Sequence, residues 1–522
     1  MRVIFRPWTP LLLILATVGF AACSDDRSRG STDGGELDGG RSDAGDAAGV
    51  LPGNDGGGDS GDRPRLDMET SDVTPEDGGP ENDGGATTAC AVDALGGILN
   101  DTSKLPPPSA GPMGYNTFVP PATDGATFVD PVFGSTVMRV SNDGDSDDLY
   151  ARNMWWSADG SRYLHRNKNG TNFADFWDVI DVATGVVTHE NIPIGGLASD
   201  SGFDPVDPDV LYRLSSGGIE KITLQPDGTW STEDFFTPPN AAPLKSLGGT
   251  MNWIDASGRY MLIRYGDEPS VHLYDTRDMA AGPYDGAIDG SNTVGAGSYV
   301  GVMPSGRYLA GYTNAEDWAV NSTGTEYGLG TGVSWEIDHA NRSIGAPNYF
   351  WNLCGDHGTF ISPSDGRDYM ILSGCISTPG VFRVDVAWDA VGKSEEEQLA
   401  HNMLLVDLDW GLGVHMAAVA RGPLKDWGFI SSEDGDDDIN AGSDDGNGFI
   451  TPWKTWGQEI IAFNVLTGDV RRLAHHRSRG LGDYVNMPRV SVSWGGEYVG
   501  WQSNFNQAGS NDTYATPFCV SP

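Results

Sequence analysis

The chain has few basic residues for its length. Of 522 residues, 32 are lysine or arginine and 73 are aspartate or glutamate, which gives a formal net charge of −41. Nucleic-acid partners need lysine and arginine to neutralise their phosphates, so this shortage argues against nucleic acid and against polyanions in general. The acidic excess instead suits a solvated extracytoplasmic surface or the binding of cations.

A membrane-spanning helix and the common catalytic motifs are also missing from the sequence. The apolar stretch at 11–18 is too short to span a bilayer stably. The sequence has no Gly-x-Ser-x-Gly nucleophile elbow, no His-Glu-x-x-His pair, no phosphate-binding loop and no Cys-x-x-Cys pair. No single motif therefore assigns the chain to a class of enzyme.

Residues 1–22 form a predicted signal peptide. Two arginines precede the apolar stretch and small residues precede Cys23, an arrangement typical of exported proteins. The segment 20–23, Phe-Ala-Ala-Cys, resembles the lipobox of bacterial lipoproteins, which implies lipidation of Cys23 and a membrane anchor. Ser24 implies, by the same resemblance, sorting to the outer membrane. The alternative is an ordinary secretory signal with a chance cysteine.

Residues 23–89 form a predicted disordered acidic tether. The part from 24 to 89 has 17 acidic residues, five arginines and no aromatic residue, and it repeats Asp-Gly-Gly. Such a segment has too little apolar surface to offset the entropy of ordering it. Glycine keeps it flexible and like charges extend it. We expect it to hold the folded region, 90–522, away from a negatively charged membrane surface.

A repeated hairpin dominates the region from Cys90 to Pro522. A turn with glycine, followed by an aromatic residue that opens a strand, recurs at 158–163, 256–260, 304–308, 364–369 and 494–498. Alternating strands that end in Asp or Asn follow at 177–181, 271–275, 335–338, 382–385 and 461–464. Glycine accepts the positive φ of tight hairpins, and aromatic residues suit strands. Two hairpins per repeat make one four-stranded propeller blade.

The repeats predict an all-β fold, a seven-bladed β-propeller of four-stranded antiparallel blades. Six blades are expected near 154–193, 198–236, 247–289, 299–346, 352–408 and 415–474. The seventh is expected to be shared between the two ends of the region, from 489–502, 513–520 and 135–140. Because the second blade is the least regular, an all-β solenoid or a pair of sandwiches remains the alternative.

The four cysteines after Cys23 form two predicted disulfides. Cys354 and Cys375 lie almost symmetrically about the turn at 364–366, so they are expected to face each other across a hairpin. Cys90 and Cys519 lie at the two ends of the region, where a bond would lock the shared blade. The oxidising compartment that the signal implies permits both bonds. The alternative is buried free thiols.

Polar residues recur where the innermost strands of the blades are expected to begin, at the rim of the central channel. The predicted catalytic residues are His357, His415 and Arg489. The predicted ligand-binding residues are Asn153 and Asn252, at the same level, and His475 and His476, on the loop expected to lead into the last blade. Imidazoles beside an arginine and amides can ligate a metal, or take a proton from a carbon next to a carboxylate. The alternative for each residue is a hydrogen-bonded start of a strand.

The segments 473–478, 486–493 and 497–504 resemble the final blade of oligogalacturonate-lyase and TolB-type propellers. The resemblance implies a propeller fold and, by extension, a lyase-like activity. Those lyases carry paired metal-binding histidines before the last innermost strand, where this chain has Met487 and Arg489. The metal site of the lyases therefore does not carry over.

The aspartate-rich loop at 433–440 predicts a Ca²⁺ site, because Ca²⁺ takes six to eight oxygen ligands and carboxylates at alternate positions supply them. The predicted ligands are Asp434, Asp436, Asp438 and Asn440. The loop does not match an EF-hand in full, so a solvated acidic insertion is the alternative.

Two functional hypotheses follow. The first is a lipid-anchored outer-membrane propeller, periplasmic or surface-exposed, that binds a glycan, a peptide or a partner protein at its central rim. The second is a polysaccharide lyase-like enzyme that acts on glycans containing uronic acid through His357, His415 and Arg489. The lack of a recognisable catalytic motif and the acidic surface favour binding.

Overall fold

The computed structural model describes 19 stretches of the chain. They are 94–99, 101–103, 111–114, 117–142, 151–166, 176–193, 201–215, 217–247, 252–266, 270–286, 288, 300–313, 331–353, 357–374, 380–408, 412–434, 455–479, 486–505 and 511–519. The signal peptide, the lipidation site and the tether lie outside these residues. So do Cys90, Cys354 and Cys375, which leaves their pairing untested.

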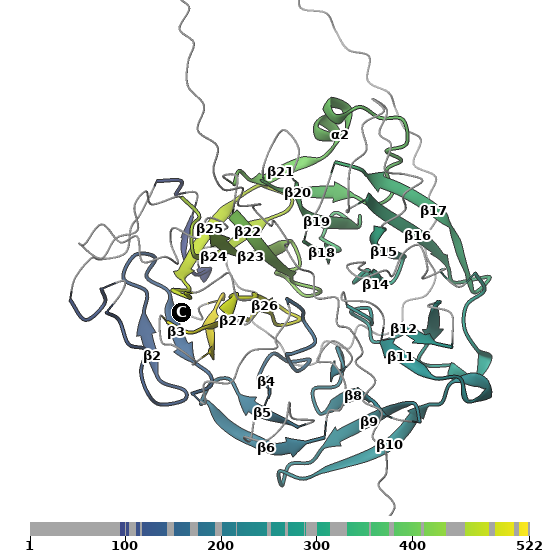
Figure 1. The fold of residues 1–522 in the computed structure, drawn as a ribbon, viewed down its shortest axis with the longest axis horizontal. Helices are drawn as coiled ribbons and strands as arrows, with labels where there is room; N and C mark the ends of the chain where they lie inside the picture. Colours follow the sequence, from purple (N-terminus) through teal and green to yellow (C-terminus); the bar gives the residue numbers. More distant parts are fainter. Residues whose placement is uncertain are drawn as a thin grey trace, which may run out of the picture. The chain divides into compact units, whose positions relative to one another are not determined.

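Seven antiparallel sheets follow one another around a ring, which confirms the predicted seven-bladed propeller (Figure 1). The first blade contains β4 (Arg162–Arg166), β5 (Trp177–Asp181) and β6 (Val186–Ile192). The second contains β7 (Gly202–Phe203), β8 (Val210–Leu214), β9 (Ile219–Leu224) and β10 (Trp230–Phe236). The third contains β11 (Leu244–Leu247), β12 (Tyr260–Tyr265) and β13 (Val271–Asp275). The short 3₁₀ helices η3 (Pro239–Ala241) and η4 (Met279–Ala281) flank this third blade in the sequence.

The fourth, fifth and sixth blades each have four strands in succession along the chain, whereas the seventh has three from the C-terminal part of the chain. The fourth contains β14 (Val300–Val302), β15 (Tyr308–Thr313), β16 (Thr331–Asp338) and β17 (Ser343–Trp351). The fifth contains β18 (Gly358–Ile361), β19 (Tyr369–Gly374), β20 (Gly380–Asp385) and β21 (Met403–Val406), with helix α2 (Glu395–His401) before its last strand. The sixth contains β22 (Leu412–Ala418), β23 (Trp427–Asp434), β24 (Glu459–Asn464) and β25 (Val470–His475). The seventh contains β26 (Ser491–Val492), β27 (Tyr498–Ser503) and β28 (Asp512–Pro517).

The ring closes by the predicted sharing of the last blade. Strand β3 (Thr136–Arg139), from the N-terminal side, pairs with β28, with Arg139 opposite Tyr514. Two strands were not predicted. They are β2 (Thr127–Val129), which extends the seventh sheet, and β1 (Ile98–Leu99), which extends the sixth by pairing with β25. Both of these sheets therefore have five strands.

The turns between the first two strands of a blade hold neighbouring blades together. Gly306 has a φ of 71°, in the left-handed region that glycine adopts without a Cβ penalty. A Cβ at this position would lie 2.7 Å from the Tyr260 ring of the third blade. In the same turn, the Ser305 hydroxyl donates to the Asp368 carboxylate of the fifth blade at 2.9 Å. The repeated glycine is thus needed both for the turn and for the close approach of blades.

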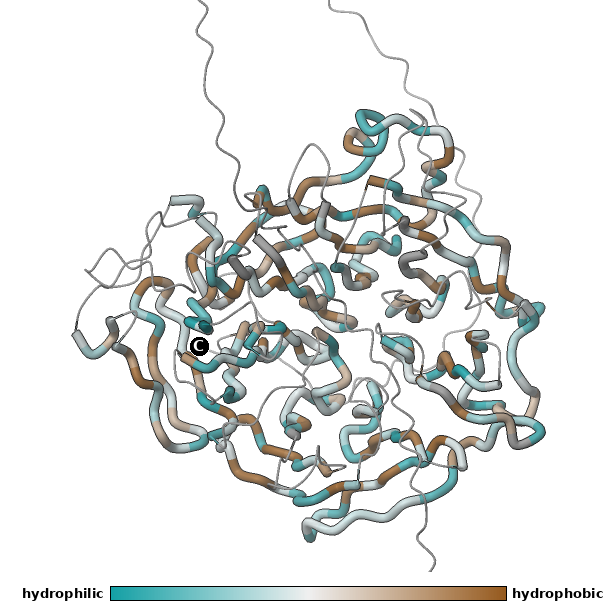
Figure 2. The backbone as a smooth tube through the Cα atoms, viewed as in Figure 1, coloured by the Kyte–Doolittle hydropathy of each residue, from teal (hydrophilic) through white to brown (hydrophobic). Residues whose placement is uncertain are grey.

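The hydrophobic core lies between adjacent sheets. In one cluster, Met303 and Ala310 of the fourth blade pack with Phe360 and Met370 of the fifth. Figure 2 shows the apolar residues concentrated along the strands of each sheet. Because every blade packs against two neighbours, each sheet needs an apolar surface on both faces.

Some details differ from the sequence-based prediction. The second blade, expected to be degenerate, is a four-stranded sheet with one register shift, between Asp234 and Phe236 of its outermost strand. Helix α2 was not predicted, although it has a sequence signature, a capping box in which Ser394 and Glu397 each bond the other's backbone amide. Within the described residues, no helix has the length and apolar character to cross a bilayer.

Candidate functional site

Three of the predicted site residues occupy equivalent positions in consecutive blades. A backbone hydrogen bond closes the first turn of the first, sixth and seventh blades, from the amides of Ser157, Val419 and Ser493 respectively. Counting four residues back from each of these amides gives Asn153, His415 and Arg489. All three residues are buried, with exposed fractions of 2%, 1% and 3%. The repeat therefore places them at one level of the innermost strands.

The structure brings His357 and His415 together. Their ring centroids lie 4.5 Å apart at an interplanar angle of 55°. His415 lies in β22, the innermost strand of the sixth blade, and His357 directly precedes β18, the innermost strand of the fifth. Ser373 fixes the backbone of His357, since its hydroxyl accepts the His357 amide at 3.3 Å and its amide donates to the His357 carbonyl at 3.1 Å.

Arg489 reaches the same level from the seventh blade. The next residue, Val490, donates its amide to the Ser431 hydroxyl at 3.3 Å. Ser431 is the cross-strand neighbour of His415 in the sixth blade. The Arg489 charge also acts on Tyr163 of the first blade, where burial raises the pKa of the phenol and the guanidinium opposes that shift.

Asn153 and Asn252 connect innermost strands. The Asn153 amide donates to the carbonyls of Ala418 at 2.8 Å and Val492 at 3.1 Å. The Asn252 amide donates to the Asn153 side-chain carbonyl at 3.0 Å. These bonds link the first, third, sixth and seventh blades. The side-chain amides of both residues therefore hold the ring of blades together.

His475 and His476 lie at the end of β25 and just after it, packed inside the protein. His476 accepts the Ser478 amide at Nδ1 (3.1 Å), so Nε2 carries the proton and donates to the Ser432 carbonyl at 2.9 Å. The His475 ring stacks on Phe133 at 4.6 Å. Exposed fractions of 2% and 0% keep both rings from solvent.

A buried group of charged residues surrounds His475, and the sequence analysis did not identify it. The amide of His475 donates to the Asp130 carboxylate at 3.1 Å, and its Nδ1 lies 3.6 Å from the same oxygen. Burial acts to raise the pKa of Asp130, but His475 and the Phe133 amide outweigh burial and hold that pKa below its usual value. Asp130 is therefore charged at neutral pH.

The second part of this group is an ion pair between Arg472 and Glu459, whose side chains are both 0% exposed. Arg472 Nε donates to Glu459 Oε2 at 2.6 Å and Nη2 donates to Oε1. Burial raises the pKa of Glu459, while Arg472 and His475 act in the opposite direction. The sequence offered one indication of this ion pair, namely that Glu459 stands at the start of an otherwise apolar run, 459–463.

The arginine of this pair also fixes the segment that follows β1. Its Nη1 donates to the carbonyls of Asp101 and Ser103. Its guanidinium lies over the rings of Phe133 and Trp456, at 4.8 and 5.3 Å from their centroids. Arg472 thus joins the N-terminal segment to the sixth blade.

No group of three or more His, Cys, Asp or Glu side chains in the described stretches could hold a metal ion. The predicted Ca²⁺ ligands fall mostly elsewhere. Asp434 is the last residue of β23, and Asp436, Asp438 and Asn440 lie outside the described residues. The predicted Ca²⁺ site therefore stays a prediction.

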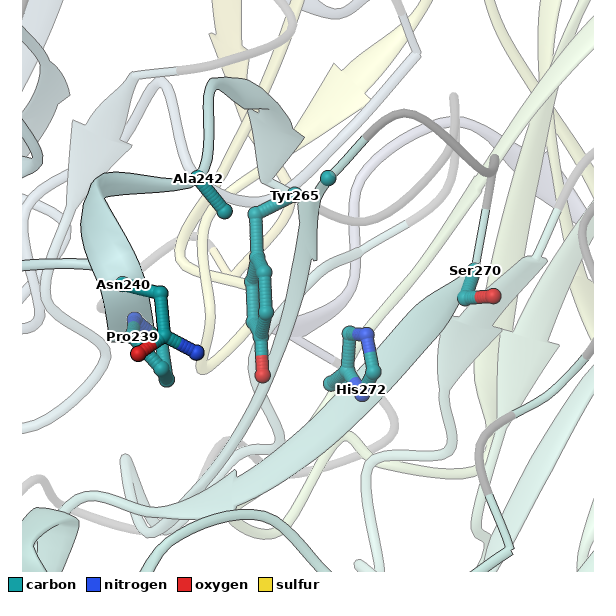
Figure 3. A pocket seen from close by; sticks show the side chains of 7 residues that line it. Pro239, Asn240, Ala242, Tyr265, Ser270 and His272 are labelled. Atoms are coloured by element: carbon teal, nitrogen blue, oxygen red, sulfur yellow. The ribbon is translucent and has the colours of Figure 1, made fainter.

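A pocket of about 360 Å³ lies beside the third blade, and none of its described lining residues belongs to the predicted site. Tyr265 and His272 form its wall, with Asn240 and Ser270 on either side (Figure 3). The sequence signal for it was weak, since an aromatic residue and a histidine on neighbouring strands occur throughout a β-protein.

No protein-family model and no curated protein matches the chain. Several solved structures align with much of the chain at low identity. Oligogalacturonate lyase from Vibrio parahaemolyticus aligns over 75% of this chain and 96% of its own, at 10% identity and a TM-score of 0.46. Hydrazine synthase from Kuenenia stuttgartiensis aligns over 73% and 99%, at 12% identity and a TM-score of 0.38. The β-propeller domain of Cps50 from Myceliophteria thermophila aligns over 61% and 80%, at 12% identity and a TM-score of 0.32. Likenesses at this level concern the fold alone, and the chain is a seven-bladed β-propeller.

Proposed function

We propose that this protein is a membrane-anchored extracytoplasmic propeller that binds a ligand, namely a glycan, a peptide or a partner protein, at its central rim. The observation that carries the proposal is the contact between His357 and His415, whose rings lie 4.5 Å apart where the innermost strands of two adjacent blades meet. Arg489 follows at the equivalent level of the next blade. Imidazole and guanidinium groups are hydrogen-bond donors, which is the chemistry that the proposed contact with a ligand would use.

The anchoring part of the proposal rests on the sequence. The signal peptide and Cys23 supply a lipid anchor in the outer membrane, and the acidic tether extends from it. The cysteine pairs Cys90–Cys519 and Cys354–Cys375 belong to the same oxidising compartment. Two backbone contacts close to Cys90 in the sequence support the first pair. Leu95 and Cys519 form an isolated antiparallel β-bridge, and the Gly96 amide donates to the Phe518 carbonyl at 2.8 Å.

A calcium ion in the loop after β23 is a further part of the proposal. That loop begins in the same sixth blade as His415, and its carboxylates suit a hard cation. Titration of the full chain with Ca²⁺ by calorimetry tests it. Loss of the heat of binding in an Asp436→Asn/Asp438→Asn variant is expected, and unchanged heat would contradict the site.

The test of rim binding compares single variants of the full chain. We expect ligands from an array of neutral and acidic glycans to bind the protein, and His357→Ala, His415→Ala and Arg489→Ala each to weaken that binding at least tenfold. His401→Ala is the matched control, since it removes an exposed imidazole on α2 of the fifth blade. Circular dichroism of each variant checks that its fold is retained.

The second candidate is a lyase acting on glycans with uronic acid, and the same three residues favour it. Arg489 neutralises the carboxylate of the uronic acid, which acidifies the adjacent C–H. His415 or His357 takes that proton as a neutral imidazole. The C–O bond to the neighbouring sugar then breaks, its oxygen takes a proton from water, and a C=C bond forms between the two carbons that lost the proton and the oxygen. General-base catalysis of this kind contributes roughly 10²–10⁴-fold in rate.

The two candidates give different results in one assay. A lyase releases unsaturated products from polyuronates, which absorb in the near ultraviolet. Binding without any such product, lost in His415→Ala, supports the binding propeller. If all three variants bind as the wild type does and no product forms, the rim has only a structural role.

A further inference from the structure

The pocket beside the third blade is separate from the rim in its residues and its connections. It is lined by Pro239, Asn240, Ala242, Tyr265, Gly266, Ser270 and His272. Helix η3 connects the outermost strand of the second blade, β10, to the innermost strand of the third, β11. Gly266 and Ser270 flank the link between β12 and β13. The Gly266 amide donates to the Pro243 carbonyl at 2.9 Å, so these described residues lie at the end of the sheet where the innermost strand of the third blade begins.

The wall of the pocket is a rigid aromatic pair. The rings of Tyr265 and His272 stack at 4.3 Å with an interplanar angle of 15°. The Tyr265 hydroxyl shares a 2.7 Å hydrogen bond with the hydroxyl of Tyr274, and Tyr274 packs edge-on against Phe236 at 5.0 Å. Because these neighbours fix the Tyr265 ring, a ligand that packs on it does not have to order it first.

Three polar side chains around this wall form no side-chain hydrogen bond among the described residues. In the part of the chain that the structure describes, no side-chain hydrogen bond engages Asn240, Ser270 or His272. The backbone of Asn240 has a φ of 57°. Asparagine tolerates this left-handed conformation better than most residues do. The pocket therefore presents amide, hydroxyl and imidazole groups that are free to bond a ligand.

The chemistry of the lining limits the class of ligand. Among the described residues of the lining there is no lysine, arginine, aspartate or glutamate, and burial lowers the pKa of His272, so these groups are uncharged at neutral pH. An anionic ligand would lose hydration there without gaining a cationic partner among these residues. A purely apolar ligand would leave the polar groups unpaired. A ligand that satisfies both limits carries no negative charge and has a flat apolar face with hydroxyl groups at its edge.

We infer that this pocket is a subsite for a neutral pyranose ring of a glycan. The ring's C–H face packs on Tyr265, and its hydroxyl groups bond Asn240, Ser270 and His272. The volume of about 360 Å³ falls within the range of small-molecule sites. The inference goes beyond the rim, because it needs neither His357 nor His415.

Calorimetry with the full chain tests the inference, with maltotriose, cellotriose, mannotriose and galactotriose as probes. At least one of these neutral sugars is expected to bind. Asn240→Gly keeps the left-handed backbone and removes the amide, and His272→Phe keeps the stack and removes the ring nitrogens. Each is expected to weaken that binding at least tenfold.

Two further variants complete the design. Ser231→Ala, on the exposed edge of β10, is the matched control and is expected to bind as the wild type does. His415→Ala separates this site from the rim, since sugar binding in the pocket is expected to survive it. The inference is overturned if none of the four sugars binds, if Asn240→Gly and His272→Phe bind as well as the control, or if a tyrosine-containing peptide displaces the sugar and depends on the same residues more strongly.

Discussion

Removing Arg472 is expected to be among the most destabilising single changes in this propeller. The residue forms a two-fold hydrogen-bonded ion pair with Glu459, and neither side chain is exposed. In Arg472→Ala the Glu459 carboxylate stays buried without its counter-ion. Breaking a buried pair in this way costs about 3–5 kcal/mol of unfolding free energy. The lost bonds to Asp101 and Ser103 place the expected cost toward the upper end.

Two matched variants locate the source of that cost. Glu459→Gln leaves Arg472 with its two carbonyl partners and its two rings, so a smaller loss of about 1–3 kcal/mol is expected. The double variant Arg472→Met/Glu459→Leu replaces the pair with apolar side chains, which is often neutral or stabilising in other buried pairs. It is therefore expected to be more stable than Arg472→Ala alone, although it still lacks the bonds to the N-terminal segment.

Urea unfolding at pH 7, followed by tryptophan fluorescence, measures these differences. Hydrogen exchange adds a local measurement, since residues 98–103 are expected to lose protection first in Arg472→Ala. The reasoning would be refuted by a loss of less than about 1 kcal/mol in Arg472→Ala, which is the range of surface pairs. Equal instability of Arg472→Ala and of the double variant would also refute it, because the buried carboxylate would then not be the cause.

Three more predictions test other parts of the molecule. Cys23→Ser is expected to move the protein from the membrane fraction to the aqueous one, and unchanged fractionation would disprove the lipid anchor. Mass spectrometry without reduction is expected to find a Cys90–Cys519 peptide, and any other partner for either cysteine contradicts the predicted closure. Because the pKa of Asp130 is lowered in the folded protein, its stabilising effect is complete above the unfolded pKa of about 4 and is lost as the pH falls through the folded value. Asp130→Asn is therefore expected to be less stable than the wild type at pH 7, with a difference that shrinks in acid; a constant difference argues against a charged Asp130.

The repetitive part of the fold could be predicted because it depends on local patterns. A glycine turn, an aromatic residue and an alternating strand are each encoded within about ten residues, and seven sheets result. Sharing of the last blade was also predictable, because 135–140 and 513–520 both carry strand patterns and lie at the two ends of the region. Strand β8 of the second blade, Val210–Leu214, shows that a short pattern suffices when its neighbours supply the rest of the sheet.

The rest of the structure depends on contacts between residues far apart in the chain. Strand β1 has two residues, and it is held by its pairing with β25 and by the Arg471 bonds to the carbonyls of Leu95 and Gly96. No local pattern predicts such a strand.

The predicted site shows the same limit. Sequence placed His357 and His415 at strand starts, but only the spacing between two blades determines that their rings lie 4.5 Å apart.

The distribution of arginine bears on the choice between the two proposed functions. Among the residues that the structure describes, six arginines are buried, at exposed fractions of 0 to 7%: Arg139, Arg152, Arg471, Arg472, Arg477 and Arg489. Four of these, Arg139, Arg471, Arg472 and Arg477, bind carbonyl or carboxylate groups where the chain ends meet. These four arginines help to close the ring. Eight aspartate and glutamate residues are buried among the described residues as well, so burial leaves the acidic excess in the net charge of −41 nearly unchanged.

An acidic surface affects ligands before they reach the rim. It repels a long polyuronate at distances up to about 10 Å at 0.1 M salt, so such a substrate would approach more slowly as the salt concentration falls. An uncharged glycan experiences no such barrier. Arg489 is the one residue of the predicted rim set whose charge is permanent, and a single buried guanidinium cannot offset a surface excess of this size. The charge pattern therefore favours a propeller that binds uncharged glycans, and it makes the pocket beside the third blade, whose described lining residues lack charged groups, the first place to look for one.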